Sequence, residues 1–163
     1  MTHSHKAMRS AHRRSRWRGA FMLAAAWLVL GSLAYGGARA AEPSAGFRVI
    51  VHLANPVTSL STDALRQIFL KQKTRWEDGE AIKPVDLGLQ SAVRDEFSRE
   101  VLARSVQAVR SYWLQRIFSG GYVPPPELHS DQAVIEYVRS NRGAVGYVSA
   151  LADVSSAKVI IVR

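Results

Sequence analysis

The sequence predicts an α/β domain over residues 47–163, with a mixed sheet flanked by helices. Stretches rich in β-branched residues alternate along the chain with amphipathic stretches of helical period, an order typical of α/β domains. Of the 163 residues, 47% are hydrophobic and 21% are charged, which is typical of globular proteins and excludes a largely disordered chain. The sequence contains no internal repeat, so we expect a single domain.

Four stretches are predicted to be strands because β-branched and apolar residues dominate them. They comprise residues 47–53, 81–87, 144–148 and 158–162. In the first stretch, the side chains at odd positions from Phe47 to Leu53 are apolar and should share one face. Pro84 lacks an N–H donor, which predicts an edge or irregular position for the second stretch.

Four helices are predicted from periodic apolar residues and from serines at their starts. Ser61, Ser91 and Ser130 each precede an amphipathic stretch, where a serine oxygen can accept a hydrogen bond from the first turn. The last helix should end at Gly143, a glycine position that favours positive φ. The third helix is expected over residues 105–118. Its apolar stripe, expected to face the core, comprises Val106, Val109, Trp113, Leu114 and Ile117.

Residues 1–40 are predicted to be a secretory signal peptide. A basic stretch runs to Arg18, an apolar stretch covers residues 20–35, and Ala38-Arg39-Ala40 has the small-residue pattern of a cleavage site. The apolar stretch is shorter than the roughly 20 residues that a bilayer-spanning helix needs. We expect cleavage after Ala40, a short tether at 41–46 and a periplasmic location. The alternative is an uncleaved N-terminal anchor.

The formal net charge of +9 lies mostly in the predicted leader. Residues 1–40 hold seven of the 22 Lys and Arg residues and no acid, so residues 41–163 hold 15 cations and all 13 acids, a net +2. The basic character of the whole chain is therefore no argument for nucleic-acid binding. The absence of cysteine excludes disulfides, thiol catalysis and cysteine-ligated zinc.

No group of residues in the sequence is typical of a catalytic or metal centre. Glu77, Asp78 and Glu80 lie in a predicted solvated turn, which does not suit them to acid–base catalysis. His52 and His129 lack metal-ligand spacing, and neither a Gly-x-Ser-x-Gly turn nor a P-loop occurs. We expect a protein that is not an enzyme, with no cofactor and no metal. A small hydrolase is the least supported alternative.

Three motifs follow one another in a specific order along the chain. They are Leu60-Ser61-Thr62-Asp63-Ala64-Leu65-Arg66-Gln67-Ile68-Phe69-Leu70, then Trp76-Glu77-Asp78-Gly79, and then Gly143-Ala144-Val145-Gly146-Tyr147-Val148. Their order and spacing resemble the phosphate-binding proteins of ABC transporters, which are type II periplasmic binding proteins. The resemblance covers nearly all of residues 47–163. It implies one lobe of a fold in which two lobes enclose the ligand.

The resemblance also implies an anion site at the start of the helix that follows Ser91. In the family, an arginine precedes a Ser-Gly-Thr at a helix start. Ser91 matches the serine, whereas Leu87, Ala92 and Val93 stand at the other positions. Unpaired N–H groups and the helix dipole attract anions to such a helix start. The alternative is that Ser91 is only a helix cap.

Four further residues complete the candidate anion-binding set. Gln90 and Arg94 flank Ser91 and have side-chain donors for an oxyanion. Ser59 and Ser61 lie at the first strand-to-helix turn, where the family also uses backbone and hydroxyl groups. For this pair, a serine-rich turn with a helix cap is the favoured alternative.

Two functions of different classes follow from these observations. The first is an exported, non-catalytic solute-binding protein for phosphate or another small oxyanion, linked to ABC-type phosphate uptake or sensing. The second is a protein-interaction module that keeps the lobe fold without ligand binding. Its partner would be a membrane transporter or sensor subunit, or a second copy in a homodimer. The second function predicts an exposed apolar patch.

Overall fold

The computed structural model describes residues 46–163. Residues 41–163 form one compact unit, which contains all of the strands and helices named below. The predicted signal peptide at 1–40 and nearly all of the predicted tether at 41–46 lie outside the described residues, so both stay predictions. Within the described residues, no helix is long and apolar enough to cross a membrane.

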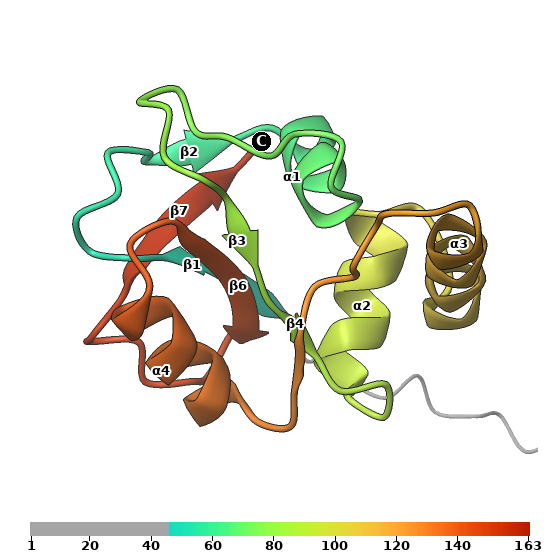
Figure 1. Ribbon diagram of the computed structural model, residues 1–163. Helices are drawn as coiled ribbons and strands as arrows, with labels where there is room; N and C mark the ends of the chain where they lie inside the picture. Colours follow the sequence, from blue (N-terminus) through green and yellow to red (C-terminus); the bar gives the residue numbers. More distant parts are fainter. Residues whose placement is uncertain (1–45) are drawn as a thin grey trace, which may run out of the picture. The chain divides into compact units, whose positions relative to one another are not determined.

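A five-stranded mixed sheet forms the centre of the unit, as predicted in kind (Figure 1). Its strand order is β2-β7-β1-β6-β3, with β1 antiparallel to β6 and β7, while the edge strands β2 and β3 run parallel to their neighbours. The strands are β1 (Phe47–Val51), β2 (Ser59–Leu60), β3 (Lys83–Pro84), β6 (Ala144–Ser149) and β7 (Lys158–Val162).

Helices pack on both faces of this sheet. They are α1 (Thr62–Phe69), α2 (Ala92–Glu100), α3 (Val106–Phe118) and α4 (Asp131–Ser140). On one face, Gly146 of β6 approaches Val134 and Val138 of α4. On the other face, the neighbouring Tyr147 stacks on Phe97 of α2, with ring centroids 3.8 Å apart. The tight fit of both faces follows from the alternation of side chains along β6.

Both faces of β1 are buried because the sheet is covered on both sides. Val49, Ile50 and Val51 are all buried, although a one-sided strand would expose Ile50. The strand ends at Val51, earlier than the predicted range of 47–53, so Leu53 lies beyond it and is 60% exposed. Continuous apolar runs are expected for strands buried on both faces.

The serine caps are confirmed. The side chains of Ser61, Ser91 and Ser130 accept hydrogen bonds from the backbone N–H three residues on, at 3.1, 3.3 and 3.2 Å. Ser105 caps α3 in the same way, at 3.2 Å. These caps are visible in the sequence because they depend only on the cap residue and the first helical turn.

The predicted strand at 81–87 is divided between two sheets. β3 joins the main sheet, whereas β4 (Asp86–Leu87) pairs in parallel with β5 (Glu127–Leu128) in a separate two-stranded sheet. Pro84 ends β3 at the sheet edge, in keeping with its missing donor. Strands of two residues, such as β2 and β5, are too short to show a hydrophobic period.

Gly143 does not have the predicted role of a glycine with positive φ after α4. The helix is capped by Asn141 in an extended conformation, and Gly143 is absent from the glycines with positive φ. Its backbone instead lies against Ala81, where a Cβ atom would come 2.0 Å from the carbonyl oxygen. The glycine is needed for this close approach of two chain segments.

We expect Gly143→Ala to lower the free energy of unfolding by at least about 2 kcal/mol, because the added methyl group meets a backbone atom. Gly88→Ala is the control, since the nearest atom to its Cβ would be 3.5 Å away. We expect the control to change stability by less than about 1 kcal/mol. Urea unfolding of both variants measures the difference, and equal losses would contradict the assigned contact.

Candidate functional site

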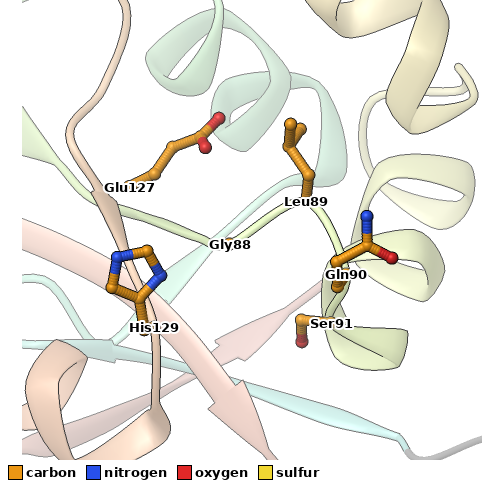
Figure 2. A pocket seen from close by; sticks show the side chains of 6 residues that line it. All are labelled: Gly88, Leu89, Gln90, Ser91, Glu127 and His129. Atoms are coloured by element: carbon orange, nitrogen blue, oxygen red, sulfur yellow. The ribbon is translucent and has the colours of Figure 1, made fainter.

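An open pocket of about 570 Å³ lies at the N-terminal end of α2 (Figure 2). The lining residues come from the turn that leads into α2 and from the end of β5. They are Gly88, Leu89, Gln90, Ser91, Glu127 and His129. The pairing of β4 with β5 brings these two segments together, and Gly88 N–H donates to the Leu128 carbonyl at 2.8 Å.

The start of α2 presents hydrogen-bond donors to this pocket. Ser91 Oγ accepts from Arg94 N–H at 3.3 Å, which leaves its own hydroxyl proton to donate elsewhere. The first-turn N–H groups of a helix have no acceptor within the helix, and the helix dipole adds partial positive charge there. Backbone and hydroxyl donors at a helix start suit a small oxyanion.

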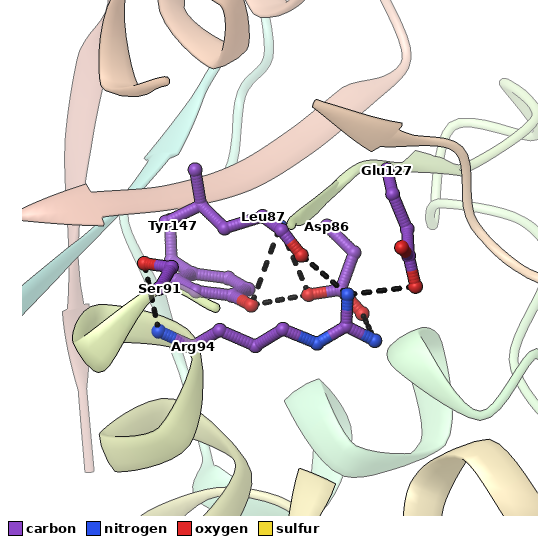
Figure 3. A network of polar contacts seen from close by, with 6 residues as sticks. All are labelled: Asp86, Leu87, Ser91, Arg94, Glu127 and Tyr147. Carbon is purple, nitrogen blue, oxygen red and sulfur yellow. Dashed lines mark hydrogen bonds and ion pairs between the residues drawn. The ribbon is translucent and has the colours of Figure 1, made fainter. Parts of the chain in front are cut away.

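Arg94 is buried below the pocket and paired with two carboxylates (Figure 3). Its guanidinium lies 3.1 Å from Asp86 Oδ2 and 2.8 Å from Glu127 Oε1, and it also donates to the Leu87 carbonyl. One positive and two negative formal charges therefore meet here. Because both carboxylates neutralise it, the guanidinium leaves no excess positive charge for an incoming anion.

Asp86 and Tyr147 complete the network. The Tyr147 hydroxyl donates to Asp86 Oδ1, and the Leu87 N–H lies 3.1 Å from the same oxygen. Burial raises the pKa of Asp86 above its ordinary value, although the Arg94 charge and the Tyr147 hydrogen bond act in the opposite direction. Burial also raises the pKa of Tyr147, so this hydroxyl stays protonated and remains a donor.

The predicted site residues fall into two separate groups. Gln90 and Ser91 line the pocket, and Arg94 lies directly below it. Ser59 belongs to β2 and Ser61 caps α1, both at the sheet edge opposite β3. Neither of these serines lines the pocket at the start of α2.

Sequence reasoning missed four residues of this region. Glu127 and His129 line the pocket, and Asp86 and Tyr147 hold Arg94 in place. Their proximity results from the two-residue pairing of β4 with β5 and from the packing of α2 on β6. Neither contact produces a recognisable spacing in the sequence. Arg94 itself gave one indication, because a charged residue on the inward face of a helix is rarely buried without a partner.

The other polar residues considered in the sequence form no second centre. Glu77 and Asp78 are exposed, as expected for the turn, while Trp76 beside them is buried and donates its indole N–H to the Gly143 carbonyl at 3.0 Å. Within residues 46–163, no group of three or more His, Asp or Glu side chains is placed to hold a metal ion.

We expect Arg94→Gln to lower the free energy of unfolding by about 3–5 kcal/mol, because it leaves Asp86 buried without its counter-charge. Arg99→Gln is the matched control on the same helix. Arg99 forms an exposed ion pair with Asp95, so its loss should cost less than about 0.5 kcal/mol. Chemical denaturation measures both, and a small loss for Arg94→Gln would contradict the buried pairing.

The raised pKa of Asp86 predicts a pH-dependent stability difference. The contribution of protonated Asp86 to the free energy of unfolding is fully present below the ordinary pKa near 3.8. It is lost as pH rises through the higher pKa of the folded state. We therefore expect the stability of the wild type, measured relative to Asp86→Asn, to fall as pH rises above the ordinary value near 3.8. Urea unfolding at a series of pH values tests this, and a difference that rises with pH would show a lowered pKa.

Comparison with known proteins places this fold. Residues 44–159 match the PBP superfamily domain, and no curated protein matches the chain. Solved structures that are similar include an ABC-type phosphate transport receptor from Vibrio cholerae, with 22% identity and a TM-score of 0.57. A Clostridium perfringens protein described as a phosphate ABC transporter substrate-binding protein with bound phosphate has the same identity and TM-score. PstS from Borrelia burgdorferi has 12% identity and a TM-score of 0.56.

These three structures share the fold over part of their length. Each match covers 72% of this chain but only 46%, 44% and 47% of the respective receptor. The chain therefore spans less than half the length of the receptors it matches. The resemblance inferred from the motifs is confirmed at the level of family and fold. The chain belongs to the family of PBP superfamily domains.

Proposed function

We propose that the protein is a non-catalytic solute-binding protein that holds phosphate or another small oxyanion at the start of α2. The pocket beside Gln90 and Ser91 carries this proposal, because it presents hydroxyl and backbone donors at a helix N-terminus. The fold shared with a receptor described with bound phosphate supports the same ligand class.

The charges around the pocket define how the oxyanion is held. Arg94 is already paired with Asp86 and Glu127, so it does not act as a free cation toward the ligand. Binding rests instead on the Ser91 hydroxyl, the Gln90 amide and the N–H groups at the start of α2. Without excess positive charge, affinity is lower than for a site with an unpaired arginine.

The proposal includes export and a partner in the envelope. Cleavage after Ala40 places residues 41–163 in the periplasm, where the protein serves ABC-type phosphate uptake or sensing with a membrane transporter or sensor subunit. Nucleic acid is not part of this proposal, because residues 41–163 carry a net charge of only +2, from 15 cations and 13 acids.

A second candidate function is a protein-interaction module, and a specific observation favours it. Leu114 and Ile117 of α3 are each 46% exposed, although the apolar stripe of this helix predicts burial. The next residue, Phe118, is 86% exposed. Apolar side chains gathered on a surface are typical of partner-binding sites.

Titration calorimetry with phosphate, sulfate and chloride tests oxyanion binding on protein purified from cells that express the full 163-residue sequence. We expect phosphate to bind and Ser91→Ala to weaken it by about 5–10-fold, because one donor is lost. Ser105→Ala is the matched control, since Ser105 caps α3 with similar geometry and neither it nor its chain neighbours line the pocket.

Two results would contradict the proposed site. The absence of heat with phosphate and sulfate from a folded sample would overturn oxyanion binding. Equal weakening by Ser91→Ala and Ser105→Ala would show that loss of a cap, rather than loss of a ligand donor, explains the effect.

A further inference from the structure

A second concave surface lies along α3, next to the oxyanion pocket. We call it the α3 groove. It has a volume of about 240 Å³ and is lined mainly by apolar side chains. The lining residues are Leu89, Arg94, Arg110, Trp113, Leu114, Ile117, Pro124 and Glu127.

The apolar side chains of the groove are not part of the core. Val109 and Trp113 turn inward and are buried, whereas Leu114 and Ile117 are each 46% exposed. α3 packs against α2 and lies beyond it from the sheet (Figure 1). Its outer side is therefore uncovered within the described residues.

The exposed apolar surface continues past the end of α3. Phe118 is 86% exposed, Tyr122 is 42% exposed and Val123 is 72% exposed. The segment then returns to the groove at Pro124, so helix and loop border the same hollow. Several exposed apolar residues within one short segment are typical of a surface that another molecule covers.

The charged residues of the segment at 101–126 are all cations, and Glu127, the acidic residue that also lines the groove, is paired with Arg94. Residues 101–126 contain the cations Arg104, Arg110 and Arg116 and no acidic residue. Arg110 lines the groove, and the Arg116 guanidinium lies 3.6 Å from the Tyr122 ring centroid. The ion pairs formed by arginines of the described residues involve Arg66, Arg94, Arg99 and Arg139, none of which lies in this segment.

We infer that the α3 groove docks an acidic, amphipathic segment of a partner protein, with an apolar side chain in the groove and carboxylates beside the arginines. The inference rests on the second candidate function above and names its partner chemistry. Apolar contact supplies the anchor, and charge complementarity selects acidic partners.

Charge separates this occupant from two others. The apolar stretch of this chain's own leader at 20–35 is uncharged and has cations on both sides, so it supplies no carboxylate to Arg110 and brings repulsive charge with its flanks. A second copy, related by a symmetric contact through the groove, would place the arginines of both α3 segments close together. An acidic segment of another protein meets neither penalty.

Selection from a random 16-residue peptide library tests the inference on protein purified from cells that express the full sequence. We expect enriched peptides to combine Asp or Glu with an aromatic or large aliphatic residue. Ile117→Glu and Arg110→Glu should each weaken the selected peptides by about 10-fold or more, as for the loss of an anchor or of a complementary charge.

Two matched controls lie away from the groove. Leu151→Glu alters an apolar residue that is 93% exposed before β7, and Arg142→Glu reverses an exposed charge after α4. Neither should change peptide binding. In buffer without phosphate or sulfate, Ser91→Ala should also leave peptide binding unchanged, which separates this site from oxyanion binding.

Each other outcome overturns the inference in a distinct way. No enrichment at all contradicts the interaction module itself. If the enriched peptides show no excess of Asp or Glu, or if Ile117→Glu and Arg110→Glu do not weaken their binding, the protein binds peptides but the α3 groove is not the acidic-peptide site. Light scattering that detects a dimer abolished by Ile117→Glu assigns the groove to a second copy. If the protein binds anionic phosphatidylglycerol vesicles more strongly than the selected peptides, and Ile117→Glu abolishes that binding, the groove binds lipid instead.

Discussion

The buried guanidinium of Arg94 holds together the three segments that build the pocket. It extends from α2 to Asp86 and the Leu87 carbonyl on β4 and to Glu127 on β5. A charge at this depth is tolerated only with its counter-charges in place, because desolvation of an unpaired ion costs several kcal/mol. The two-residue strands β4 and β5 are too short to fix their own position, and the ion network supplements their few backbone hydrogen bonds. The turn at 88–91 and the start of α2 are positioned as a result.

This structural role limits what Arg94 does toward a ligand. Glu127 already pairs with one terminal nitrogen of the guanidinium, and Asp86 pairs with the other. A ligand at the start of α2 therefore meets neutral donors on one side and a carboxylate on the other. The fold that this chain shares with the phosphate receptors covers less than half of their length. The outer surface of α3 is therefore a candidate binding surface in addition to the pocket.

Features that depend on neighbouring residues were predictable, and those that depend on distant contacts were not. The serine caps and the four helices follow from a helical turn and its period, and the main strands follow from β-branched runs. The close approach of Gly143 to Ala81 brings together two segments that lie 62 residues apart in numbering, so the sequence suggested only a helix-terminal glycine. Arg94 was expected to face a ligand, and its burial depends on β5, a strand without a periodic signal. The apolar stripe of α3 was recognised, but periodicity cannot tell whether the chain itself or another molecule covers it.

The pocket at the start of α2 and the α3 groove share part of their walls. Leu89 and Glu127 line both hollows, on either side of the turn that leads into α2. Any ligand that draws Glu127 away from Arg94, or moves Leu89, changes the wall of the neighbouring site. By linkage, the effect of an oxyanion on partner affinity must equal the effect of the partner on oxyanion affinity. Because Arg94 keeps Asp86 when Glu127 moves, this exchange leaves no unpaired buried arginine. The side chain of Glu127 is 42% exposed, whereas that of Asp86 is only 8% exposed, so Glu127 is the carboxylate free to move between the two sites.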